Sequence, residues 1–208
     1  DVLGSRGLGD VYKRQIIECI TGALDAKDAY TAGHSQRVSE MALKVCELIG
    51  LKKKGIRKIH IAAHLHDIGK IGIPDAILNK EGRLTDEEFE IMKTHSAIGA
   101  GILSKSKSLS EFSDIVLHHH ERFDGKGYPD GLKGEKIPVG ARIIAICDSI
   151  DAMTSNRRYR KALGFDVCYQ EIEKNLGKMY DPIIGQYVLD HFDKVTACLH
   201  KNVAVKAV

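Results

Sequence analysis

The sequence lacks a long apolar run, closely spaced cysteines and a strong net charge, and each absence excludes a class of protein. No apolar run approaches the ~20 residues of a membrane-spanning helix. The five cysteines are scattered and include no C-x-x-C pair, which argues against a disulfide framework and a thiolate zinc site. A formal net charge of +3 is too small to indicate a nucleic-acid-binding protein. We therefore expect a cytoplasmic protein that has reduced thiols, spans no membrane and binds no DNA.

The chain also lacks an initiator methionine, a signal peptide, internal repeats and low-complexity segments. Residues 1–14 contain three glycines and no sustained periodicity, so we expect a non-native or linker segment there. We interpret the chain as a fragment of a longer protein. Its 208 residues suit one domain, which we place at residues 15–200, followed by a short tail at 201–208.

Apolar residues recur at helical spacing through most of this domain. The stripe from Val38 to Ile49 predicts a helix that ends at Gly50, and a second helix is predicted over about 55–68. The apolar run at 142–153 could be a buried strand, but its length favours a buried helix.

Helix caps and one long loop divide the pattern. Caps are predicted at three helix starts: Thr85 with Glu88, Ser108 with Glu111, and Asp181 with Pro182. Residues 123–140 hold five glycines and two prolines, which predicts an irregular loop. A loop of that length inside a compact domain is usually functional. We therefore predict an all-α fold with one long glycine-rich loop.

The candidate catalytic residues are histidines and aspartates, and ten histidines are many for this length. His66 and Asp67 end an apolar helix. Each could ligate a metal ion, and a carboxylate has two oxygens, so it can bridge two ions. Lys70 follows closely enough to offer charge to a phosphate. Taken alone, the pair could equally be a helix cap or a surface pair.

Three consecutive histidines precede the long loop. We expect His119 and His120 to be the ligands because they lie nearest the loop, although a solvated basic turn is the alternative. His34 is predicted to open one helix and His95 to end another, and each alone could be structural. Asp148 differs, because an unpaired carboxylate in so apolar a segment is costly to bury and needs a partner such as a metal ion.

Together the candidates supply nitrogen and oxygen donors and no thiolate. Such a set suits iron, manganese, zinc or nickel better than calcium or magnesium. Seven ligands exceed one tetrahedral site, but they suit two ions ~3.5–4 Å apart that share Asp67 and activate a hydroxide for displacement at phosphorus. Asp151, one turn after Asp148, is a weaker candidate. A basic cluster follows, either as a solvated face or as phosphate-binding groups: Arg157, Arg158, Arg160 and Lys161.

Five segments, in order, resemble the HD-GYP domain, the bacterial cyclic di-GMP phosphodiesterase branch of the HD superfamily. They are YTAGHSQRV (30–38), HLHDIGKIGIPD (64–75), LTDEEFEIMKTH (84–95), HHERFDGKGYPDGL (119–132) and ARIIAICDSIDAMTSNRRYR (141–160). The paired HD and GYP elements are highly specific. The resemblance implies an HD-superfamily helical bundle whose long loop carries the GYP signature: Gly127, Tyr128 and Pro129.

The resemblance also implies roles for individual residues. One metal ion would bind His34, His66, Asp67 and Asp148. The other would bind Asp67, His95, His119 and His120. His66, Asp67 and Lys70 would be catalytic, and the substrate would be held by Lys70, Tyr128, Arg157 and Arg160.

Two positions depart from the pattern of the family. Tyr30 stands where relatives with a third metal have a glutamate, so we expect two divalent ions, iron or manganese in first place and zinc or nickel as alternatives. Arg158 replaces the usual proline before Tyr159, which bears on the segment that holds Arg157 and Arg160.

The implied activity is hydrolysis of the 3′–5′ phosphodiester of cyclic di-GMP to pGpG through a metal-bridging hydroxide, with further cleavage to GMP left open. The alternatives are another cyclic dinucleotide, such as cyclic GMP-AMP, or a non-catalytic sensor or interaction module. The expected partners are diguanylate cyclase (GGDEF) domains, through the GYP loop, and an upstream receiver or sensor domain. A homodimer is a further option.

Overall fold

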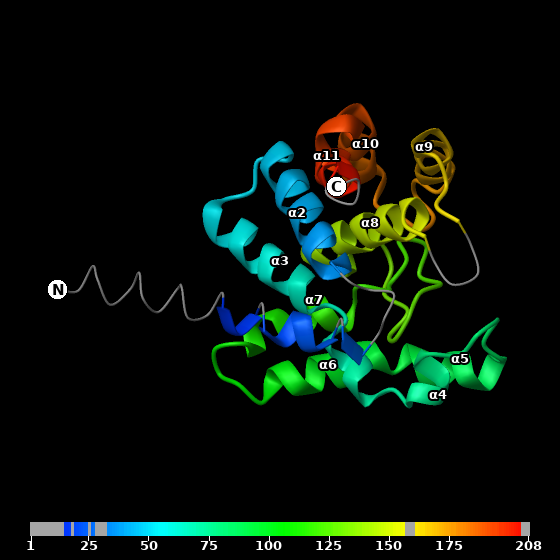
Figure 1. Ribbon diagram of the computed structural model, residues 1–208. Helices are drawn as coiled ribbons and strands as arrows, with labels where there is room; N and C mark the ends of the chain where they lie inside the picture. Colours follow the sequence, from blue (N-terminus) through cyan, green and yellow to red (C-terminus); the bar gives the residue numbers. More distant parts are fainter. Residues whose placement is uncertain (1–14, 18, 25, 28–32, 157–160, 205–208) are drawn as a thin grey trace.

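The computed structural model describes residues 15–17, 19–24, 26–27, 33–156 and 161–204, and this part of the chain is helical without a β-strand, as predicted (Figure 1). The first three of these ranges form an N-terminal helical segment. The elements that follow it are α2 (His34–Leu48), α3 (Lys53–Leu65), η1 (Ile68–Gly72), α4 (Asp75–Leu78), α5 (Asp86–Lys93), α6 (His95–Ser104), η2 (Ser110–Phe112), α7 (Ser113–Leu117), η3 (Gly134–Lys136), α8 (Val139–Thr154), α9 (Phe165–Lys174), α10 (Pro182–Asp190) and α11 (Phe192–Ala204).

The helices are arranged around a central group. In Figure 1, α4, α5 and α6 lie along one side and α9, α10 and α11 along the other, with α2, α3 and α8 between them. None of the helices in the described ranges combines the length and the apolar character that crossing a bilayer requires. Residues 1–14 and 205–208 lie outside the described residues, and α11 continues past residue 200 to Ala204. The proposed domain limits therefore stay a prediction.

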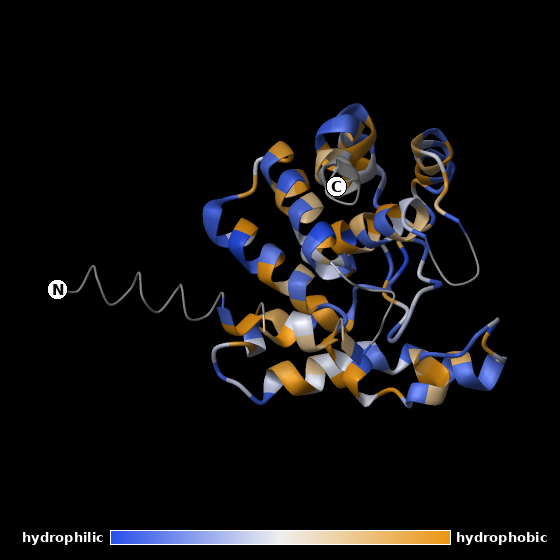
Figure 2. Cartoon of the chain, in the orientation of Figure 1, coloured by the Kyte–Doolittle hydropathy of each residue, from blue (hydrophilic) through white to orange (hydrophobic). Residues whose placement is uncertain are grey.

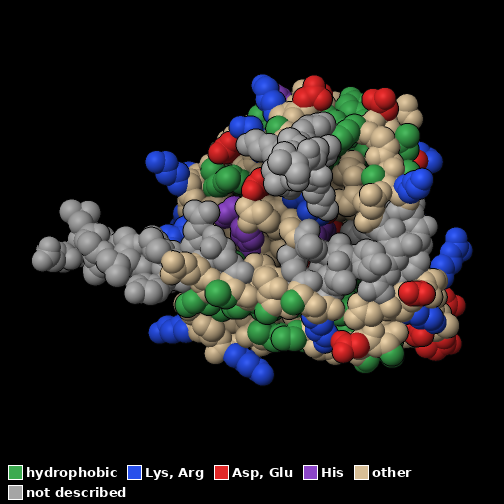
Figure 3. All heavy atoms as spheres, viewed as in Figure 1, with side chains coloured by type: hydrophobic (Ala, Val, Ile, Leu, Met, Phe, Trp, Pro, Cys, Tyr) green, Lys and Arg blue, Asp and Glu red, His purple; other side chains and the backbone are tan. Residues whose placement is uncertain are grey.

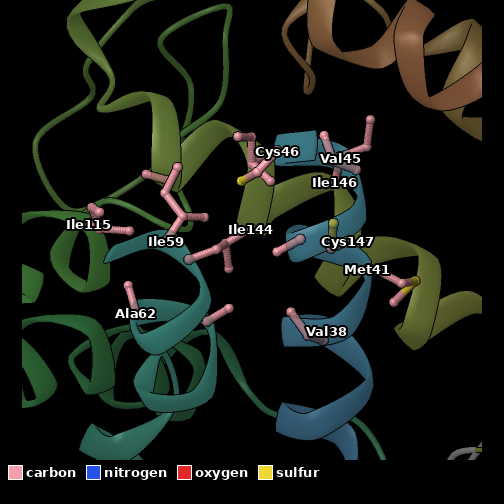
Figure 4. Close-up of a cluster of buried hydrophobic side chains, with 14 of the residues drawn as sticks. Val38, Met41, Val45, Cys46, Ile59, Ala62, Ile115, Ile144, Ile146 and Cys147 are labelled. Atoms are coloured by element: carbon pink, nitrogen blue, oxygen red, sulfur yellow. The ribbon is translucent and has the colours of Figure 1, made fainter. Parts of the chain in front are cut away.

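The core lies where α2, α3 and α8 meet. Apolar and polar residues alternate along α2 and α3, as amphipathic helices require (Figure 2). Their apolar faces turn inward, so Met41 from α2, Ile59 from α3 and Ile144 from α8 are all buried in one cluster (Figure 4). The run at 142–153 lies within α8, which confirms the predicted buried helix.

Two observed helix ends can be compared with the ends that the sequence predicts. Helix α2 ends at Leu48, and Gly50 follows with φ 74°, a left-handed conformation that glycine adopts without strain, so this predicted end is confirmed. The predicted end of the second helix at residue 68 is wrong, because α3 stops at Leu65. The chain leaves the helix there and forms the 3₁₀ turn η1, which packs against α6.

The predicted caps also have mixed outcomes. Thr85 and Glu88 form a reciprocal capping box, and Asp181 caps α10 with Pro182 in the first turn, so both predictions are confirmed. The prediction of a helix cap at Ser108 is wrong. Its hydroxyl pairs with that of Ser106 at 3.1 Å, and the chain continues into η2 before α7 begins.

The long glycine-rich loop joins α7 to α8. Within residues 123–140 the regular structure before α8 is the three-residue turn η3, close to the predicted irregular loop. Its first part is held to the segment before α10, since the Asp124 amide donates to the Lys178 carbonyl at 2.8 Å. The Tyr128–Pro129 peptide bond is cis. The loop is thus fixed to the helical frame beside the ends of α7 and α8.

Candidate metal centre

Seven predicted ligands from five parts of the chain come together in the structure. Three overlapping groups have ligand atoms within 4.8 Å of one another: His34 with His66 and Asp148, His66 with Asp67 and His119, and His95 with His119 and His120. Most of these side chains are buried, whereas the Lys, Arg, Asp and Glu side chains that are visible in Figure 3 project from the surface.

Helix ends place most of the seven side chains. His34 is the first residue of α2, as predicted, and His66 directly follows α3. His95 begins α6, so the prediction that it ends a helix is wrong; α5 stops at Lys93, and the chain turns at Thr94. Asp148 projects from the middle of α8. Separate helices and the turns after them therefore deliver one or two donors each to one point, a pattern typical of metal centres in helical proteins.

A close approach of two backbones brings His95 to the centre. At Gly69, in η1, an added Cβ would lie 1.8 Å from the carbonyl oxygen of His95 and 2.5 Å from the amide nitrogen of Gly99. No residue with a side chain fits at this position unless the backbone moves. Glycine thereby lets the turn after Asp67 lie directly on the first turn of α6.

The Asp67 carboxylate faces both sides of the cluster. Its Oδ2 lies 3.7 Å from His34 Nε2 and 3.5 Å from His66 Nε2, whereas its Oδ1 lies 3.5 Å from His95 Nε2. Each oxygen is thus turned toward a different group of histidines. A carboxylate in this orientation can share its two oxygens between two cations.

The histidine hydrogen bonds fix which ring nitrogen faces the centre. The Nδ1 atoms of His66, His95 and His119 lie 2.6, 2.8 and 2.6 Å from the carbonyl oxygens of Ala63, Met92 and Val116, respectively. A carbonyl can only accept, so each Nδ1 carries the hydrogen and each neutral ring turns an Nε2 lone pair inward. The Nε2 atoms of His95 and His119 are 3.3 Å apart. Two facing lone pairs repel each other unless a cation lies between them, so the donor set fits metal ions.

His34 is oriented by a carboxylate. Its Nδ1 lies 2.7 Å from Asp151 Oδ2, and Arg37 holds Asp151 through contacts of 2.5 Å and 3.0 Å to its two oxygens. Asp151 therefore orients a candidate ligand, and its side chain is satisfied without a metal ion. Arg37 was not among the predicted site residues. The sequence feature that could have indicated Arg37 is its spacing. Arg37 stands three residues after His34, just as Asp151 stands three residues after Asp148.

The protonation states favour metal binding. Burial lowers the pKa of His95 and of His119 to about 4, which keeps both rings neutral. Burial also opposes ionisation of Asp67, but the positive charge of Lys70 is the largest of the influences that outweigh it, so the pKa of Asp67 lies well below the usual value. At His34, burial opposes protonation, but the hydrogen bonds that its ring donates to Asp148 and Asp151 prevail and raise its pKa to about 9. A metal ion at this position would therefore displace a proton from His34, in surroundings that favour positive charge.

Two further predicted residues lie beside the cluster. The Lys70 Nζ is 2.7 Å from Asp67 Oδ2. The Tyr128 ring stacks on His120, with the ring centres 4.9 Å apart and an angle of 29° between the rings. Four residues to which the sequence gave a role lie outside the described residues: Tyr30, Arg157, Arg158 and Arg160.

Glu121 is a buried residue that was not among the predicted site residues, although it directly follows the three consecutive histidines. Its side chain accepts the backbone amide of Asp130 at 2.8 Å and so ties the end of the histidine run to the residue that follows Pro129. Gly127 packs against the same stretch, where an added Cβ would lie 2.3 Å from the Arg122 amide nitrogen. These contacts fix the loop and hold the Tyr128 ring against His120.

Comparison with known proteins identifies the fold and the family. The family model described as HD domain matches residues 18–184. Among solved structures, a cyclic GMP-AMP-specific phosphodiesterase from V. cholerae superposes with a TM-score of 0.68 at 17% identity, covering 86% of this chain and 48% of that one. The HD domain of the L. monocytogenes phosphodiesterase PgpH, in complex with cyclic di-AMP, gives a TM-score of 0.60 at 20% identity over 85% of this chain and 96% of that one.

Curated relatives are more similar in sequence. The chain is 43% identical over 184 residues to a cyclic di-GMP phosphodiesterase of Thermotoga maritima, covering 88% of this chain and 50% of the relative. It is 41% identical to the cyclic di-GMP phosphodiesterase response regulator RpfG of Xanthomonas campestris, covering 82% and 46%. A 3′3′-cGAMP-specific phosphodiesterase of Vibrio cholerae is 34% identical, covering 88% and 36%. The chain spans half or less of the length of these relatives. With its HD and GYP motifs in place, the chain belongs to the HD domain family, in its HD-GYP branch.

Proposed function

We propose that the chain is a metal-dependent phosphodiesterase that hydrolyses the 3′–5′ phosphodiester bond of cyclic di-GMP and releases pGpG. The observation that carries the proposal is the Asp67 carboxylate, which turns one oxygen to His34 and His66 and the other to His95. The names of the relatives at 43% and 41% identity support cyclic di-GMP as the substrate.

Two divalent ions would share the seven donors. One would be held by His34, His66, Asp67 and Asp148, and the other by Asp67, His95, His119 and His120. The nitrogen and oxygen donors suit iron or manganese first, with zinc or nickel as alternatives. When bound, the two ions supply Lewis acidity and positive charge to a phosphoryl group during in-line displacement.

The protein's own groups orient the donors and the substrate. The carbonyl groups of Ala63, Met92 and Val116 keep three imidazoles in the tautomer that presents Nε2. Lys70 stands next to Asp67, where its ammonium group neutralises charge that develops on a phosphate oxygen. The Tyr128 ring forms a flat wall beside His120, a surface on which a guanine base can stack.

A turnover assay with metal analysis tests this proposal. We expect wild-type protein to contain about two metal ions per chain and to convert cyclic di-GMP to pGpG. The His66→Ala/Asp67→Ala variant is expected to lose both the metal and the turnover. His191→Ala is a matched control, because His191 directly follows α10, is not a predicted ligand, and donates its Nδ1–H to the Tyr187 carbonyl at 3.1 Å.

Three results would contradict the proposal. Substoichiometric metal in active protein, or turnover unchanged by the double substitution, would remove the two-metal centre. Binding of cyclic di-GMP without hydrolysis by fully metallated protein would favour a sensor. Faster turnover of cyclic GMP-AMP than of cyclic di-GMP would reassign the substrate, as the similarity to a cGAMP-specific relative permits.

A further inference from the structure

One lysine connects the N-terminal helical segment to the turn that follows the metal centre. The Lys27 Nζ donates to the carbonyl oxygens of Ile71 at 2.7 Å and Ile73 at 3.1 Å, and it lies 3.5 Å from an Asp75 carboxylate oxygen. The Lys27 carbonyl in turn accepts from the Asn79 side chain at 3.5 Å. A single residue is therefore bonded to both ends of the short stretch 71–79.

This stretch continues directly from the candidate metal centre. Asp67 is the N-cap of η1, and Lys70, within η1, pairs with Asp67. The Lys27 bonds end on Ile71, within the same turn, and on Ile73, its C-cap. The turn is thus bounded by Asp67 at its start and by the Lys27 side chain at its finish.

The turn is also fixed by packing against α6. Gly69 lies against the His95 carbonyl and the Gly99 amide of α6. An added Cβ at Gly72 would lie 3.1 Å from the Ile98 side chain, which is also in α6. Because η1 packs against α6 and is also bonded to Lys27, it has little room to shift. A displacement of the N-terminal helical segment would therefore reach Asp67, Lys70 and His95 through one rigid turn.

We infer that Lys27 is a positioning residue, which couples the N-terminal helical segment to the metal centre by holding η1 in place. This inference rests on the proposed function for the role of the centre, and it concerns a residue that contacts neither metal nor substrate. Lys27 would act through the backbone of η1 on Asp67, the carboxylate shared by both ions, and on Lys70.

Substitution of Lys27 combined with cobalt loading tests the inference. Lys27→Met keeps the length and the apolar stem of the side chain but removes its donors, whereas Lys27→Arg retains donors for the two carbonyl groups. Lys44→Met is the matched control, because Lys44 makes an exposed pair with Glu47 on α2. For each variant the Co²⁺ absorption spectrum and dissociation constant, kcat and KM for cyclic di-GMP, and the thermal midpoint are measured.

We expect Lys27→Met to weaken Co²⁺ binding and lower kcat by about 10-fold, the lower end for groups that support metal ligands. Its cobalt spectrum should differ from that of the wild type at saturating metal, with KM changed less than kcat. Lys27→Arg should keep most of the wild-type Co²⁺ affinity and kcat, and Lys44→Met should behave as wild type.

Lys27→Met with wild-type cobalt spectrum, affinity and kcat would overturn the inference, even if its thermal midpoint fell, because Lys27 would then serve stability alone. Wild-type protein that binds cobalt without hydrolysing cyclic di-GMP would contradict the proposed function, and the spectral comparison would still decide the role of Lys27. Wild-type protein that binds no cobalt would overturn both.

Discussion

At the scale of single residues, the centre depends on groups that orient its histidines. His66, His95 and His119 each donate Nδ1–H to the carbonyl group of the residue three positions earlier, so the local backbone selects the tautomer of these three rings. His34 starts its helix and has no such carbonyl within α2. Asp151 takes that role from α8, and Arg37 keeps it ionised. Outer groups of this kind set the strength with which ligands bind a metal.

Substitution of Asp151 by asparagine should weaken metal binding at the His34 side. The change removes the negative charge on which the His34 ring depends, with little change in volume. We expect the dissociation constant for Mn²⁺ to rise about 10- to 100-fold, measured by titration of metal-free protein. Asp190→Asn serves as the control because Asp190 is exposed and bonded to Gln186 on α10. An unchanged constant in the Asp151 variant would show that the carboxylate is not needed to orient His34.

The sequence predicted the seven residues of the cluster but not the groups that orient them. Spacing and donor chemistry made these residues candidates, and the resemblance to the HD-GYP domain implied the role of each as a metal ligand. Arg37 and Glu121 were missed because their roles depend on partners 114 and 9 residues away in the chain, Asp151 and Asp130. Only the folded chain shows such contacts.

At the scale of elements, the contact between η1 and α6 determines where α3 ends. The apolar pattern continues to residue 68, and so periodicity alone predicts three residues too many. Local sequence does predict the starts of α5 and α10, because each cap side chain accepts backbone amides that lie no more than three residues further along the chain. Where a helix end has no local cap, contacts with distant parts of the chain determine where the helix ends.

Replacement of Gly69 by alanine should disrupt this contact. The added Cβ would meet backbone atoms of His95 and Gly99, which cannot move as a flexible side chain does. We expect the free energy of unfolding to fall by about 3 kcal/mol or more, together with loss of metal binding. Gly101→Ala in the same helix α6 has open space around it and should instead raise stability by up to about 1 kcal/mol. Similar denaturation midpoints for the two variants would contradict the close approach.

The cap of α10 is a second element with a clear energetic role. Asp181 accepts the amides of Ile183 and Ile184 at 2.8 and 3.0 Å and also pairs with Arg142 at the start of α8. We expect Asp181→Ala to lower the free energy of unfolding by about 2 to 4 kcal/mol, measured by urea denaturation. Thr85→Ala, in the exposed capping box of α5, should cost only about 1 kcal/mol. Equal costs would show that the Arg142 contact adds nothing.

At the scale of the whole molecule, one helical frame serves both as core and as support for the centre. Helices α2, α3 and α8 bury Met41, Ile59 and Ile144 together, and the same three helices carry or directly precede His34, His66 and Asp148. Asp67 follows His66 directly, and the remaining donors come from α6 and from the turn after α7. Helix α7 packs on α3 and α8, and α6 packs on α7 and η1. Unfolding of the core should therefore release the metal ions in the same transition.

Thiol reactivity reports on the core of the molecule. Burial raises the pKa of Cys46 to about 12, so at pH 8 this thiol stays protonated and unreactive. Cys147 and Cys168 are also buried, whereas Cys19 is exposed. We expect a thiol-reactive disulfide reagent to modify Cys19 first and the three buried thiols only after denaturation. Cys19→Ser should remove the fast phase, and a fast phase that persists would contradict the described packing.

The central claim is that Asp67 is shared by two metal ions, and anomalous diffraction from crystals of manganese-loaded protein tests it most directly. The structure predicts two anomalous peaks about 3.5–4 Å apart, one within the group His34, His66 and Asp148 and one within the group His95, His119 and His120, with an Asp67 oxygen bound to each. A single peak, or two peaks that do not both contact Asp67, would contradict the account.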